Sequence, residues 1–211
     1  MDPGMATRSP AGQFGPSAVL TRQPARLREA KTLDGVIKAR SGSPMVLRLP
    51  KFGERLTQAE VRVVAGLARG QTNAEIGKAL FLSEVTVKSH LQRIGRKLGC
   101  GDRAEIVHVA YGIGYLNDLP PQWRRPTGLS ARELEVLRCI AEGLTYRKIG
   151  ERLGTGTETV KGVARLLFVR LRARGRAHAV ALGHQRGLLV LSQDRIRTLA
   201  MAAARTGALT A

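Results

Sequence analysis

The chain has few of the residues from which disulfide frameworks, metal sites and catalytic centres are built. It contains two Cys and four His among 211 residues, and neither type shows the spacing of a disulfide framework or a metal-ligand set. Cys139 lies beside Ile140 in a segment expected to be helical, so we expect a buried thiol. No nucleophile–base set and no phosphate-binding glycine loop appears. The sequence therefore predicts a protein that is not an enzyme and that needs no cofactor and no metal.

Long apolar runs and acidic residues are also scarce. No run of about 18 apolar residues exists, which argues against a transmembrane helix, and the N-terminus lacks the apolar core of a signal peptide. Only 16 Asp and Glu face 35 Lys and Arg, which gives a net charge of +19. This balance favours polyanionic partners, above all nucleic acid, over a merely basic protein or one that touches anionic membranes. We expect a cytoplasmic, nucleoid-associated protein that binds double-stranded DNA and no membrane.

An internal repeat dominates the rest of the chain. The segment that begins at Leu56 returns at Leu129 without a gap, and about 18 of the 61 paired positions in residues 56–116 are identical. Each copy predicts four helices, of which the second and third form a helix-turn-helix. The predicted fold is all-α, with two such tetrahelical domains in tandem behind a largely disordered basic N-terminal arm. The predicted divisions are an arm at 1–50, a first domain at 51–116, a linker at 117–128, a second and more divergent domain at 129–190, and a tail at 191–211 that could form a helix.

Capping residues mark the ends of the helices in both copies. The second helix begins with a capping box in the first copy, Thr72 with Glu75, whereas in the second copy Thr145 remains and Lys148 replaces the acid. The first helix has a capping box and a terminal glycine in each copy: Thr57, Glu60 and Gly70, then Ser130, Glu133 and Gly143.

The third helix of each copy is amphipathic. Its apolar residues recur at helical spacing, which assigns that stripe to the core and leaves the opposite face for DNA. On that polar face, Lys88 can bond guanine and Gln92 can bond adenine in the major groove. The alternative is that Lys88 is a solvated surface charge. The core stripes are Val87, Leu91, Ile94 and Leu98 in the first copy, and Val160, Ala164, Leu167 and Leu171 in the second.

Hydroxyl groups at helix N-termini, together with one arginine, are candidates for contacts to DNA phosphates. Thr72 and Ser83 could equally act only as helix caps. The candidates are Thr72, Ser83, Thr86 and Arg96 in the first copy, and Thr145 and Thr159 in the second.

Residues 56–116 resemble the LuxR-type helix-turn-helix module, the output domain of the NarL/FixJ group. The resemblance lies in LTQAE, GQTNAEIGKAL, SEVTVKSHLQRIGRKLG and DRAEIVHVAYGIGYL. Residues 129–189 are similar to the same family more loosely, through LSARELEVLRCIAEGLTYRKIGERL, TETVKG and RAHAVALGHQRGLL. Within the latter, GLTYRKIGERL is also similar to the last region of sigma factors. The resemblance implies a four-helix fold, dimer contacts through the fourth helix, and base reading by Lys88, Ser89 and Gln92 and by their counterparts Lys161, Gly162 and Arg165.

The sequence departs from the family pattern in two places. Residues 1–55 are too short and too polar for the receiver or ligand-binding domain that usually precedes this module. The third helix of the second copy adds four apolar residues outside the core stripe, Val163, Leu166, Phe168 and Val169. Such an apolar excess predicts a partner or interdomain surface.

These patterns favour a sequence-specific transcription regulator. The alternatives are a nucleoid-type DNA binder of low specificity, and a protein that uses its second repeat to contact RNA polymerase or a sigma factor. One chain could serve as an intramolecular pseudo-dimer on two half-sites, or the first copies of two chains could form a homodimer. The basic arm either follows the phosphate backbone or is an uninvolved tail.

Overall fold

The computed structural model describes residues 36–38, 44–46, 49–122 and 128–207. Most of the predicted disordered arm, and part of the predicted linker, therefore lie outside the described residues. Within the arm, strands β1 (Val36–Lys38) and β2 (Pro44–Val46) pair antiparallel, with Val36 opposite Val46. Helical and disordered patterns alone were predicted for this part of the chain, so these strands are an addition to the predicted fold. All the helices described below belong to a separate compact unit, residues 48–211.

The first repeat folds into four helices, as the sequence predicted. The capping boxes of the first two helices are present, with the Glu60 carboxylate 2.7 Å from the backbone nitrogen of Thr57 and the Glu75 carboxylate 2.7 Å from that of Thr72. Gly70 follows the first helix with a φ of 74°, the left-handed conformation that favours glycine. The helices are α1 (Gln58–Ala68), α2 (Asn73–Leu80), α3 (Glu84–Leu98) and α4 (Arg103–Gly112).

The second repeat folds in the same way, with weaker caps. Ser130 and Glu133 form a full capping box, whereas Thr145 caps its helix without an acidic partner, as predicted. Gly156, which takes the place of Ser83, gives no side-chain cap. The helices are α5 (Ala131–Ala141), α6 (Tyr146–Leu153), α7 (Thr157–Leu171) and α8 (Arg176–Gln185).

The buried side chains of both repeats form one continuous hydrophobic cluster. Both predicted stripes face it, and Cys139 is buried as expected. The apolar excess on α7 divides into two groups: Leu166 and Val169 are exposed, whereas Val163 and Phe168 are half-buried against the cluster. The prediction of an exposed face is therefore wrong for Val163 and Phe168, because α7 packs against α5, α6 and α8.

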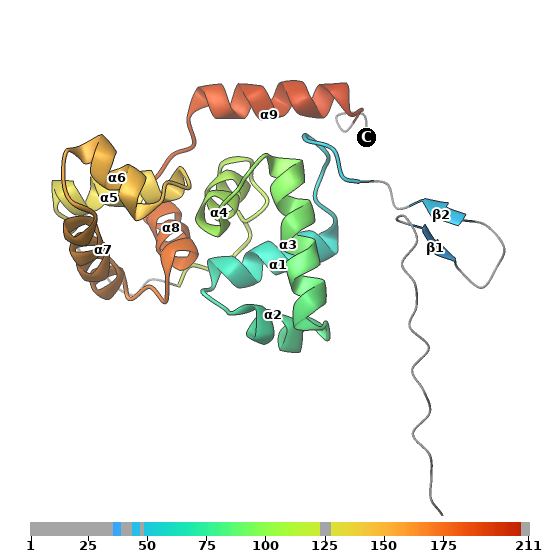
Figure 1. The fold of residues 1–211 in the computed structure, drawn as a ribbon, viewed down its shortest axis with the longest axis horizontal. Helices are drawn as coiled ribbons and strands as arrows, with labels where there is room; N and C mark the ends of the chain where they lie inside the picture. Colours follow the sequence, from blue (N-terminus) through green and yellow to red (C-terminus); the bar gives the residue numbers. More distant parts are fainter. Residues whose placement is uncertain (1–35, 39–43, 47–48, 123–127, 208–211) are drawn as a thin grey trace, which may run out of the picture. The chain divides into compact units, whose positions relative to one another are not determined.

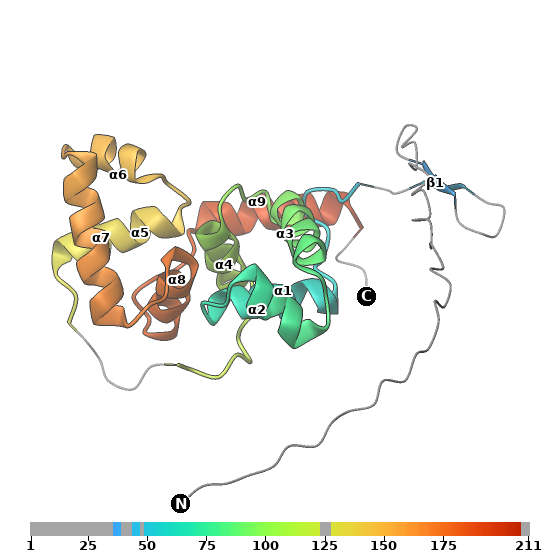
Figure 2. The same ribbon diagram turned by 60° about the horizontal axis from the view of Figure 1, so that its bottom comes forward.

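The two repeats meet through their fourth helices, α4 and α8 (Figures 1 and 2). Around this central contact, α1 packs against α8 and α5 packs against α4, so equivalent helices exchange equivalent contacts. Polar groups also cross the interface: His108 Nδ1 lies 2.7 Å from His184 Nε2, and Gln185 donates to the Tyr111 hydroxyl at 2.9 Å. The arrangement is that of a two-fold pair built within one chain.

A ninth helix, α9 (Gln193–Arg205), follows the second repeat and returns to the first (Figure 1). Arg195 Nη2 donates to the carbonyl oxygens of Leu98 and Gly99, which end α3, at 3.2 and 2.7 Å. The backbone of Ala202 lies so close to Gly53 that a Cβ on that glycine would be 2.4 Å from it. The predicted helical tail is thus a packed element of the unit. None of the helices within the described ranges is long and apolar enough to span a bilayer.

Candidate nucleic-acid interface

Helix α3 presents a polar face to solvent. Ser83 caps its first turn, and Gly99 ends it in the left-handed conformation with a φ of 64°. Lys88, Ser89 and Gln92, the three residues predicted to read bases, are all exposed, and Arg96 is exposed one turn further on. The structure therefore brings the first repeat's predicted reading residues together on one accessible face, opposite the buried stripe.

The lysine predicted to read bases in each repeat forms an ion pair with a carboxylate of its own helix. Lys88 Nζ lies 2.9 Å from Glu84, and Lys161 Nζ lies 2.7 Å from Glu158. These side chains are substantially exposed, so each pair contributes little to stability. The pairs fix the lysines along the helix surface, and a base or phosphate must compete with the carboxylate for the ammonium group.

The three hydroxyl groups predicted to contact phosphate in the first repeat act as helix caps or lie beside one. Thr72 Oγ1 accepts from the backbone of Glu75 at 3.2 Å, and Ser83 Oγ accepts from the backbone of Thr86 at 3.1 Å. The Ser83 and Thr86 hydroxyls are 2.8 Å apart, so one donates to the other. A capping hydroxyl keeps its own proton as a donor, so the capping role and a phosphate contact are compatible.

In the second repeat the corresponding residues are arranged differently. Thr145 caps α6, Thr159 and Arg165 are exposed on α7, and Lys161 is half-buried. The exposed Leu166 and Val169 replace Arg93 and Arg96 of the first repeat. The outer surface of α7 is thus less basic and more apolar than that of α3.

An ion pair fixes each third helix to the first helix of its repeat, and in the first repeat both partners are buried. Glu60 pairs with Lys97 at 2.8 Å, and Lys97 also donates to the carbonyl of Arg55 at 3.1 Å. The second repeat has the same arrangement at equivalent positions: Glu133 pairs with Arg170 at 3.2 Å, and Arg170 donates to the carbonyl of Gly128 at 3.2 Å.

Glu60 and Glu133 were predicted from the sequence only as capping residues, and these ion pairs were not predicted. The repetition of an acid at one position and a base at the other was the signal that could have found them. Burial acts to raise the pKa of Glu60, but hydrogen bonds from Lys97 and Thr57 outweigh it, so its pKa is lowered. The carboxylate therefore stays charged and holds α3 in place.

The two predicted reading surfaces remain separate. Helices α3 and α7 lie on opposite sides of the α4–α8 pair (Figures 1 and 2). Each surface is thus carried by its own helix-turn-helix, and the contact between the fourth helices sets how one is placed relative to the other.

Comparison with known proteins places both repeats in one family. The family described as "Bacterial regulatory proteins, luxR family" matches residues 54–110 and 127–182, together more than half of the chain. The chain is 41% identical over 70 residues to the HTH-type transcriptional activator RamA of Corynebacterium glutamicum, which covers 33% of this chain and 25% of that protein. It is 40% identical over 58 residues, 28% of each protein, to the transcriptional regulatory protein LiaR of Bacillus subtilis.

These relatives are matched over about a quarter of their length. No solved structure is significantly similar to the chain. The matches support DNA binding and transcription regulation as the general role of the helix-turn-helix segments.

Proposed function

The chain belongs to the LuxR family of bacterial regulatory proteins, and on this basis we propose that it is a sequence-specific DNA-binding transcription regulator. In this proposal α3 and α7 enter the major groove by their N-terminal halves. Lys88, Ser89 and Gln92 read base edges in one half-site, and Lys161 and Arg165 do so in the other.

The observation that carries the proposal is the exposed polar face of α3 on a firmly anchored helix. The reading side chains are accessible, while the opposite face is buried and the C-terminal half is tied to α1 by the Glu60–Lys97 pair. A reading helix has to be held rigidly, because a bidentate contact to a base edge depends on the position of the side chain.

We further propose that one chain acts as the pseudo-dimer. The α4–α8 contact uses the surface through which the fourth helices of two separate chains would otherwise meet. A homodimer through two copies of α4 would require α8 to leave that surface. Two reading helices in one chain can address two half-sites whose centres are about 34–36 Å apart on one face of DNA.

A second role for α7 is favoured by one observation. Leu166 and Val169 are 59% and 74% exposed at positions where the first repeat has arginines. Exposed apolar residues beside a reading face suit a protein partner, and RNA polymerase or a sigma factor is the candidate class. In this alternative the first repeat selects the DNA site and the second contacts the transcription machinery.

The test begins by mapping the sites bound across the genome and measuring affinity for a mapped site and for random DNA. A ratio of about 10³ or more supports sequence-specific regulation, whereas a ratio near one supports a nucleoid-type binder. The mass of the complex on a short duplex then gives the number of chains per site.

A single chain that protects two half-sites, with one lost when Lys161 and Arg165 are both changed to Ala, supports the pseudo-dimer. Two chains per site, with no effect of that double change, would refute it. Co-purification of polymerase after DNA removal, abolished by Leu166→Ser with Val169→Ser, would instead support the partner role for α7.

A further inference from the structure

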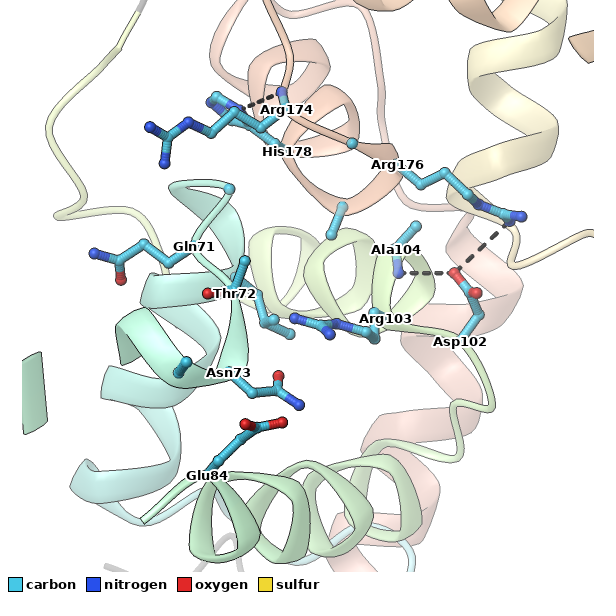
Figure 3. Close-up of a pocket in the computed structure, with 15 residues that line it drawn as sticks. Gln71, Thr72, Asn73, Glu84, Asp102, Arg103, Ala104, Arg174, Arg176 and His178 are labelled. Carbon is cyan, nitrogen blue, oxygen red and sulfur yellow. Dashed lines mark hydrogen bonds and ion pairs between the residues drawn. The ribbon is translucent and has the colours of Figure 1, made fainter. Parts of the chain in front are cut away.

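A hollow lies between the two repeats, away from the predicted reading residues of α3 and α7. Its volume is about 540 Å³, and it is bounded by the start of α2, the start of α4 and the turn between α7 and α8 (Figure 3). Thr72, Asn73 and Arg103 line it from the first repeat, and Arg174 and Arg176 line it from the second. The volume is in the range of small-molecule sites.

The charged groups around the hollow are mostly basic. Two of the three arginines are paired: Arg176 lies 3.7 Å from Asp102, and Arg174 lies 3.5 Å from Glu75. The Arg103 side chain, which is exposed, makes no hydrogen bond or ion pair with any described residue, although the Asp102 carboxylate acts on it electrostatically. In Figure 3 its side chain extends from α4 toward Thr72 and Asn73. The Arg103 guanidinium group therefore has donors available for a ligand in the hollow.

The internal repeat explains why Arg103 lacks partners. Its counterpart Arg176 donates to the carbonyl of Leu144 at 2.7 Å, lies 5.3 Å from the centre of the Tyr146 ring, and faces Asp102 across the interface. These interactions engage Nη2 and one face of the Arg176 guanidinium group, while its buried Nε has no hydrogen-bond partner among the described residues.

Arg103 has no counterpart of two of these partners. Asn73 occupies the position equivalent to Tyr146, and Gly175 occupies the position equivalent to Asp102. The shorter amide leaves space beside Arg103, and the glycine offers no opposing carboxylate across the interface. Gly175 also provides no side-chain cap for α8.

An anion would satisfy the groups that remain. A guanidinium group binds phosphate through paired, charge-assisted hydrogen bonds. The buried side-chain oxygen of Asn73 has no hydrogen-bond partner among the described residues, and rotating the amide would present its NH₂ group as a further donor. Glu84, which also lines the hollow, is held by Lys88 at 2.9 Å.

We propose that this hollow binds a phosphate group between the two repeats, with Arg103 as its main ligand. The phosphate could belong to a free phosphorylated small molecule or to the backbone of bound DNA, and the DNA case alone rests on the proposed function. An occupant held by Arg103 from one repeat and Arg174 from the other would stabilise the relative placement of α3 and α7.

The test uses the full chain and three variants. Arg103→Gln removes the guanidinium group that would bind the phosphate. Arg62→Gln removes the same charge from an exposed position on α1 and is the control. Asn73→Tyr restores the aromatic residue of the second repeat and fills the hollow. Thermal unfolding of each variant identifies those that fold.

The first measurement is pyrophosphate binding by calorimetry without DNA, at constant ionic strength with chloride as the reference anion. If the source is a free phosphorylated molecule, binding should be saturable, about ten-fold weaker in Arg103→Gln, lost in Asn73→Tyr, and unchanged in Arg62→Gln.

The second measurement is the salt dependence of DNA binding. If the source is the DNA backbone, Arg103→Gln should lower the slope by about 0.9 while Arg62→Gln leaves it unchanged. Equal behaviour of Arg103→Gln and Arg62→Gln in both measurements would overturn the proposal. A wild-type chain that binds pyrophosphate but prefers no DNA site would refute the proposed function and leave this site standing.

Discussion

The two repeats share an internal framework and differ on their surfaces. Both keep the core stripe of the third helix, an ion pair between a buried glutamate and a basic residue of that helix, and the hydrogen bond from this basic residue to a backbone carbonyl. On the surface, Arg93 and Arg96 of α3 give way to Leu166 and Val169 of α7. The framework has to be the same in both because it fixes the fold, whereas a surface can change when its partner changes.

The largest difference we expect concerns the Glu60–Lys97 and Glu133–Arg170 ion pairs. The Lys97 side chain is 9% exposed, whereas the Arg170 side chain is 48% exposed. Glu60→Gln should therefore cost about 3 kcal/mol of unfolding free energy, since it strands a buried charge. Glu133→Gln should cost about 1 kcal/mol, since water reaches Arg170.

Both changes keep a side chain that can complete the capping box, so urea unfolding followed by circular dichroism isolates the effect of the charge. Equal losses in the two variants would show that burial of the basic partner does not distinguish the repeats.

The second comparison concerns base reading. Lys88→Ala or Gln92→Ala should weaken binding to a mapped site by about 1–3 kcal/mol and relax preference at one or two bases. Lys161→Ala should relax base preference in the other half-site by less, because α7 offers Gly162 and apolar residues where α3 offers polar ones. Titrations on systematically substituted duplexes measure this. A sharper loss of base preference in Lys161→Ala than in Lys88→Ala would show that α7, and not α3, makes the more specific contacts to bases.

The third comparison concerns the contact between the repeats, where their ionisable residues differ. His184 occupies the position of Tyr111, and it contacts His108. Burial, together with the charge of His108, lowers the pKa of His184 to about 4, and burial also lowers the pKa of His108.

The unfolded chain therefore takes up protons below a pH of about 6.5 while the folded chain resists them, so stability falls as the pH drops from about 6.5 toward 4. Each histidine contributes at most about 1.4 kcal/mol per pH unit. Urea unfolding at pH 7 and pH 5.5 should show this loss, and His184→Tyr, which copies the first repeat, should reduce it. An unchanged pH dependence in that variant would place its origin elsewhere, for example at His178, whose pKa burial also lowers.

The smallest effect concerns two helix ends. Phe81 and Arg172 adopt left-handed backbone conformations with φ values of 57° and 55°, where the other repeat has Gly154 and Gly99. Phe81→Gly and Arg172→Gly should each raise the melting temperature, since relief of the strain is worth about 1 kcal/mol. Phe81 is 96% exposed, so little packing is lost. Phe81→Ala keeps the strain and is the control; an equal gain from Ala and Gly would exclude the backbone explanation.

Local patterns in the sequence predicted most of the helical fold. Capping boxes at Thr57 and Ser130, glycine ends at Gly70 and Gly143, and the apolar stripes were recognisable because each depends on residues a few positions apart. The exposure of Lys88 and Gln92 followed from the same periodicity.

Contacts between distant segments were not predictable in this way. Arg195 reaches the end of α3 from about a hundred residues away, and no local pattern indicates that. The hollow around Arg103 depends on three segments meeting, and the half-burial of Phe168 depends on several helices packing against α7. Each requires the tertiary arrangement, which helical periodicity does not contain.

If one chain acts as the proposed pseudo-dimer, the α4–α8 contact has a consequence for how the protein responds to its own abundance. Two separate chains that must meet on DNA fill a site with a steep dependence on protein concentration. Two repeats joined in one chain associate at a fixed effective concentration that does not change with expression level. At low abundance, the occupancy of a DNA site would then rise in proportion to the number of protein molecules. A few molecules per cell could produce a graded response without a threshold.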